Sequence, residues 1–127
     1  MQDKYLYEYA VIRVVPRVER EEFLNVGIIV YCSKQGFLEA KIHLNEERFK
    51  IFSSAVETEE LQQYLQTWKR ICKGGTEGGS IGLLPISSRF RWLTATRSTI
   101  VQTSKVHPGF CDNASETLES LFQELVS

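Results

Sequence analysis

Two apolar, strand-like runs separated by a polar hook constrain this chain more than any other feature. Residues 9–15 and 26–32 are rich in β-branched side chains, and residues 16–25 between them are mostly polar or charged. This pattern is typical of two strands joined by a connection. Arg13 interrupts the first run, and Asn25 precedes the second. Because an unpaired buried polar group costs about 1–3 kcal/mol, we expect both side chains to be hydrogen-bonded or to line a cavity.

The remaining pattern predicts an α+β fold. We expect a third strand over residues 37–43, a short helix over 45–53, a long helix over 58–73, a strand over 98–106 and a helix after 112. The tripeptide HPG at 107–109 is typical of a turn. This order of elements lacks the regular alternation of a parallel sheet. The prediction is therefore an antiparallel β-sheet with two long helices packed on one face.

The length of 127 residues favours one domain, spanning residues 1–127, with one core. Residues 73–80 are half glycine, which predicts a flexible connection. Their spacing does not fit a known phosphate-binding loop. No run approaches the roughly 20 apolar residues of a membrane span, and the first residues do not resemble a signal peptide. We therefore expect a cytoplasmic protein without a membrane partner.

The sequence offers no cofactor, metal or catalytic motif. The three cysteines stand about forty residues apart with no Cys-x-x-Cys pair, which argues against a disulfide framework and a zinc site. Glu22 and His107 form a weak candidate pair for proton transfer, because neither hydrogen-bond reach nor a tuned pKa is visible in a sequence. The pattern leans away from an enzyme.

Charge is distributed unevenly along the chain. No aspartate or glutamate occurs from Gly78 to Cys111. The cations of this segment are Arg89, Arg91, Arg97 and Lys105. Such a bias marks either an anion-binding face or an ordinary solvated surface. A pI near 6.1 and the lack of a nucleic-acid-binding signature argue against a nucleic-acid partner.

Several stretches together resemble a known family. They read YAVIRVVP at residues 9–16, EFLNVGIIV at 22–30, RFRWLTA at 89–95, RSTIVQ at 97–102, VHPG at 106–109 and LESLF at 118–122. The chain is similar to domain of unknown function 3037. The resemblance implies a small cytosolic bacterial protein without an assigned activity, sometimes encoded beside a kinase-like protein related to the HipA toxins. It supplies no catalytic residues.

Two functional hypotheses follow. The first is an accessory or interaction module that docks on a partner, for which the resemblance suggests a HipA-like kinase. Edge strands of an antiparallel sheet are natural docking sites, and a homodimer is also compatible with this hypothesis.

The second hypothesis is a protein that binds a small anion, such as a phosphate, a nucleotide or nucleic acid. Guanidinium groups beside hydroxyls suit phosphate or carboxylate. The candidate ligand-binding residues are Arg13, Glu22, Asn25, Arg97, Ser98 and Thr99. The structural alternative is that Glu22 pairs with an arginine and that Asn25 closes a turn. We rank the interaction module slightly above the anion-binding protein.

Overall fold

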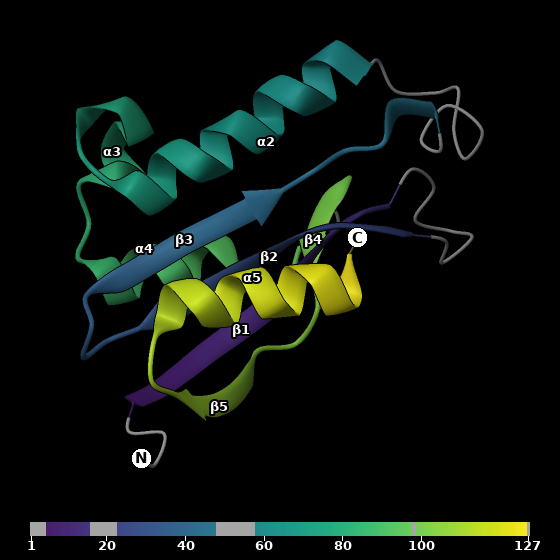
Figure 1. The fold of residues 1–127 in the computed structure, drawn as a ribbon. Coiled ribbons are helices and arrows are strands. Elements are labelled where there is room, and N and C mark those ends of the chain that lie inside the picture. Colours follow the sequence, from purple (N-terminus) through teal and green to yellow (C-terminus); the bar gives the residue numbers. More distant parts are fainter. Residues whose placement is uncertain (1–4, 16–22, 48–57, 98, 127) are drawn as a thin grey trace.

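A computed structural model describes residues 5–15, 23–47, 58–97 and 99–126 (Figure 1). The strands are β1 (Tyr5–Val14), β2 (Leu24–Cys32), β3 (Phe37–Ile42), β4 (Val101–Thr103) and β5 (His107–Cys111). The helices are α2 (Thr58–Lys73), the 3₁₀ turn η2 (Thr76–Gly78), α3 (Gly79–Gly82), α4 (Ile86–Leu93) and α5 (Ala114–Leu125). Residues 46–47 are helical, and residues 48–53 of the helix expected over 45–53 lie outside the described residues.

One antiparallel sheet connects all five strands, in the order β3-β2-β1-β4, with β5 also paired to β1. The predicted α+β class and antiparallel pairing are confirmed. The two apolar runs of the sequence are the neighbours β1 and β2, in a register that places Arg13 opposite Asn25. The polar hook between them therefore connects two adjacent strands, although residues 16–22 lie outside the described part.

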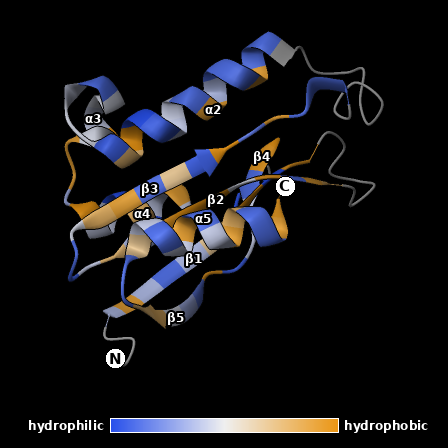
Figure 2. Ribbon diagram, viewed as in Figure 1, coloured by the Kyte–Doolittle hydropathy of each residue, from blue (hydrophilic) through white to orange (hydrophobic). Residues whose placement is uncertain are grey.

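The two long helices do not share a face, contrary to expectation. One core lies between the sheet and α2 and α4, and includes Ile12, Leu65 and Phe90. A second core lies on the opposite face, where Ile28 packs near Phe122 of α5. Figure 1 shows α5 in front of the strands and α4 behind them, and Figure 2 shows the outward side of α2 in hydrophilic colours.

The burial of β2 explains this arrangement. Seven consecutive residues, 26–32, are buried, so this strand presents apolar side chains to both faces. A strand that is buried on both faces requires a cover on each side of the sheet. The same alternation in β1 sends Ile12 to one core and Val11 to the other.

The tripeptide at 107–109 lies within strand β5, so the predicted turn is wrong. Pro108 is tolerated because β5 is an edge strand, where a missing N–H breaks no ladder bond. Gly109 is required in the strand because a Cβ there would lie 2.6 Å from the ring of Tyr7. Ser104 lies between β4 and β5, and its Oγ accepts a hydrogen bond from the Val11 amide at 2.9 Å.

The long helix predicted over residues 58–73 is confirmed as α2. The glycine-rich stretch after it contains η2 and α3, and the flexibility predicted for residues 73–80 stays a prediction. Among the described residues, no helix has both the length and the apolar character required to cross a membrane.

Candidate functional site

The structure brings Arg13 and Asn25 together as register partners on β1 and β2. The Arg13 guanidinium lies 4.3 Å from the ring centroid of Phe23. Asn25 donates from Nδ2 to the carbonyl oxygen of Leu125 at 3.3 Å, which ties the hook to the end of α5. Glu22, the predicted partner between them, lies outside the described residues.

Arg97 and Thr99 have other partners. Arg97 donates to the carbonyl oxygens of Trp92 and Leu93 at the end of α4 and stacks on the Trp92 ring, 4.3 Å from its centroid. Thr99 donates from Oγ1 to the Val101 carbonyl at 2.8 Å. Ser98 lies outside the described residues.

The described members of the predicted cluster thus form two groups. Arg97 attaches to α4, which packs on one face of the sheet, whereas Asn25 bonds to α5 on the other face. Among the described residues, no hydrogen bond or ion pair joins Arg13 or Asn25 to Arg97 or Thr99. Their role in binding an anion stays a prediction.

Three of the four cations in residues 78–111 form hydrogen bonds or an ion pair within the fold. Arg91 makes two bonds of 2.7 Å to the carboxylate of Glu8, and this bond to Glu8 raises the pKa of the guanidinium. Arg89 and Arg97 bond to backbone carbonyls. Lys105 is exposed. The uneven charge therefore largely reflects capping and pairing within the fold.

The outer edge of β3 is open among the described residues. No described strand pairs with this edge. The His43 amide donates to Val26 at 2.7 Å, and bonded pairs alternate along an antiparallel ladder. The backbone of Glu39 and Lys41 therefore points toward β2, and the N–H and C=O of Ala40 point outward.

The opposite edge of the sheet is protected. In β5, Pro108 has no N–H to offer, and the irregularity at Ser104 breaks the row of backbone groups. Proline and irregular pairing are devices by which proteins prevent edge-to-edge association. Strand β3 contains neither proline nor glycine, and its register with β2 is regular.

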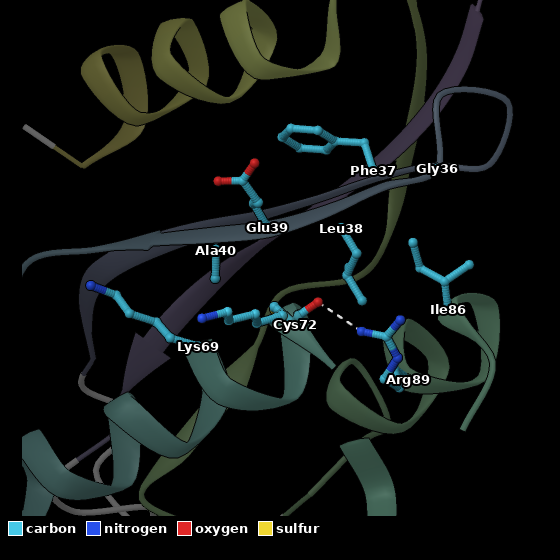
Figure 3. Close-up of a pocket in the computed structure, with 10 residues that line it drawn as sticks. Gly36, Phe37, Leu38, Glu39, Ala40, Lys69, Cys72, Ile86 and Arg89 are labelled. Carbon is cyan, nitrogen blue, oxygen red and sulfur yellow. Dashed lines mark hydrogen bonds between the residues drawn. The ribbon is translucent and has the colours of Figure 1, made fainter. Parts of the chain in front are cut away.

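A pocket of about 520 Å³ lies beside β3, between this strand and helices α2 and α4 (Figure 3). We call it the basic pocket. Its lining residues are Gly36, Phe37, Leu38, Glu39, Ala40, Lys69, Cys72, Lys73, Ile86 and Arg89. In Figure 3 Leu38 and Ala40 point from the strand toward α2, whereas Glu39 points to the other side. Three cations, Lys69, Lys73 and Arg89, line the pocket together with one carboxylate, Glu39.

Arg89 is the best-positioned cation of the basic pocket. Its Nη1 donates to the carbonyls of Ile71 and Cys72 at 2.9 and 2.7 Å, and its Nε donates to Leu84 at 3.0 Å. These bonds satisfy the end of α2, where a cation is favoured. Gly74 leaves the necessary room, because a Cβ there would lie 2.9 Å from Nη1. Nη2 makes no hydrogen bond to a described residue.

The thiol in this pocket does not suit nucleophilic chemistry. Burial raises the pKa of Cys72 to about 12, so the thiol stays protonated at neutral pH. Cys32 and Cys111 are also buried. Among the described residues, no group of three or more His, Cys, Asp or Glu side chains is placed to hold a metal ion.

Comparison with known families decides the assignment. The sequence model of one family matches residues 9–126, which is most of the chain. The chain belongs to the family described as protein of unknown function (DUF3037). No curated protein and no solved structure matches it. For this DUF3037 chain, functional argument therefore rests on the geometry of its own residues.

Sequence reasoning missed the basic pocket of the DUF3037 chain. Lys69 and Lys73 read as the basic last turn of a helix, and Arg89 reads as part of a charge bias. The sequence predicts a third strand without proline or glycine, but only the strand order places that strand at an edge.

Proposed function

We propose that this protein is an interaction module that docks an extended segment of a partner protein on the free edge of β3. The observation that carries the proposal is the outward-facing backbone of this strand beside a pocket of about 520 Å³. In this binding mode, main-chain hydrogen bonds supply affinity and neighbouring pockets supply specificity. The protection of the opposite edge favours β3 as the docking strand.

Charge complementarity favours an acidic partner segment at the basic pocket. Lys69, Lys73 and Arg89 approach the strand from α2 and α4. Lys41 is neutralised by Glu119 at 2.6 Å, which attaches β3 to α5 and steadies the edge. A rigid edge loses little conformational entropy of its own when a partner binds.

The family resemblance implies a HipA-like kinase, which we propose as the partner. Co-expression of this protein with a kinase encoded beside its gene tests the proposed partner. The informative substitution is Ala40→Pro, because it removes an N–H that points outward and leaves the ladder with β2 intact. Ala40→Ser is the matched control, since it changes the side chain and keeps the N–H.

A complex that survives Ala40→Ser and is lost with Ala40→Pro supports docking on β3. If both variants keep the complex, the edge is not the docking site, and if wild type forms none, the kinase is not the partner. A second copy of this chain is the alternative occupant of the edge. It would appear as a dimer in light scattering that Ala40→Pro converts to monomer.

A second candidate function is the binding of a small anion at Arg13. The observation that favours it is that the buried Nε of Arg13 has no hydrogen-bond partner among the described residues. A buried unpaired donor is costly, and an anion would satisfy it. Thermal melting with phosphate and with ATP tests this function. Stabilisation that Arg13→Gln removes and Arg97→Ala retains would support it, and the absence of stabilisation in the wild type would refute it.

A further inference from the structure

A second pocket lies at the other end of β3. It has a volume of about 650 Å³ and we call it the acidic pocket. Its lining residues are Ile42, His43, Leu44, Asn45, Glu46, Glu47 and Gln62. Glu46 and Glu47 are both exposed. The residues of β3 that enter the two pockets are different, so the pockets occupy opposite ends of the same strand.

Helix α2 contributes residues to both pockets. Gln62, near its start, lines the acidic pocket, whereas Lys69 and Lys73, near its end, line the basic pocket. The helix thus runs antiparallel to β3. Glu59 and Glu60 occupy its first turn, which complements the helix dipole. The basic pocket therefore takes its lysines from the end of α2, and the acidic pocket takes its carboxylates from Glu46 and Glu47 after β3.

The nearest lysine of the basic pocket lies farther from the acidic pocket than the screening length. Lys69 and Gln62 stand seven residues apart in α2, which is about 10 Å at 1.5 Å per residue. The screening length at physiological ionic strength is about 8 Å. A charged group of a docked segment therefore responds to the nearer pocket rather than to the net charge of the edge.

We propose that the β3 edge selects partner segments by the order of their charges, with acidic residues at the basic pocket and basic residues at the acidic pocket. The inference rests on the proposed docking function and deepens it, because it names the chemistry of the partner. The segment is extended, spans about eight residues and carries its two kinds of charge at opposite ends. Charge order also fixes the direction in which the segment lies along β3.

A displayed library of random decapeptides, selected against the wild-type protein, tests the inference. Selected peptides that bind the Ala40→Ser variant but not the Ala40→Pro variant define the edge-dependent set. We expect these peptides to carry acidic residues near one end and basic residues near the other. If no selected peptide distinguishes the two variants, the docking function itself fails. If edge-dependent peptides show no charge order, docking stands and the present inference fails.

Exchanging the charges of the basic pocket and of the peptide then shows which end of the peptide binds at this pocket. In fluorescence anisotropy, the Lys69→Glu/Lys73→Glu variant should bind an edge-dependent peptide at least tenfold more weakly than wild type. Replacing the acidic residues of that peptide with lysine should restore most of the affinity. The matched control is Arg70→Glu/Lys105→Glu, which makes the same charge change at exposed positions that line neither pocket. Equal loss in the control, or no restoration by the lysine peptide, would overturn the inference.

Discussion

Arg91 in α4 and Glu8 in β1 form a two-pronged ion pair, with both nitrogen–oxygen distances at 2.7 Å. The pair attaches α4 to the sheet next to the stacked rings of Tyr31 and Phe90, whose centroids lie 5.1 Å apart. The pair is partly exposed, with more than half of the Arg91 side chain open to solvent. Its energetic contribution is therefore that of a surface ion pair.

Glu8→Gln should lower the free energy of unfolding by roughly 0.2–1 kcal/mol, and the difference should shrink in 1 M salt. Glu8 raises the pKa of Arg91, so at alkaline pH the contribution is lost as pH rises through that pKa, far above neutrality. Urea denaturation at pH 6 and pH 9 should therefore give the same difference. Glu124→Gln is the control, and an equal loss in that variant would contradict the role of the pair.

Arg89→Met should destabilise the protein by about 2–3 kcal/mol, because it removes the bonds to three backbone carbonyls at the end of α2 and before α4. Arg89→Lys should recover only part of this loss, since an ammonium lacks the planar fork of donors. Urea denaturation measures both variants. A change below about 0.5 kcal/mol in Arg89→Met would contradict the capping role.

Gly109→Ala should destabilise the protein by about 1–3 kcal/mol, because the new methyl would overlap the ring of Tyr7 in the neighbouring strand. Tyr7→Val in the same chain should relieve the overlap, so the double variant should lose less than the sum of the single losses. Thermal unfolding of the four proteins measures this coupling. Purely additive losses would mean that the Tyr7 ring is not the reason why glycine is required at position 109.

Stability should fall between pH 9 and about pH 12 through Cys72. Burial raises the pKa of its thiol from 9.0 to about 12, so the unfolded chain releases the proton first. The contribution of the protonated thiol is complete below pH 9 and is lost as pH rises toward the folded value. Urea denaturation at pH 8 and pH 10.5 should show a smaller loss in Cys72→Ala than in wild type. Cys111→Ala is the comparison, and equal slopes in all three proteins would contradict the assignment.

Much of the sheet was predictable from local pattern. The hairpin of β1 and β2 follows from two β-branched runs, and α2 follows from apolar residues at helical spacing between an acidic and a basic turn. Strand β5 was missed because Pro108 and Gly109 signal a turn in isolation. Only the ring of Tyr7 and the edge position explain why both lie in a strand.

The candidate site was less predictable because its partners are backbone groups and distant elements. Arg89 donates hydrogen bonds to the backbone carbonyls of residues 71, 72 and 84. A pattern of side chains in the sequence does not reveal bonds to backbone groups. Arg13 and Asn25 were predictable as neighbours, since they flank the same connection. The position of Arg97 depends on where α4 ends, and the sequence did not define that boundary.

The coverage of both sheet faces has a consequence for how this family could diversify. With α2 and α4 covering one face and α5 the other, a new partner cannot reach either face of the sheet without displacing a helix. Substitutions at the rim of this three-layer sandwich can change which partners bind. Substitutions there leave both cores undisturbed, so binding preference and folding can change separately.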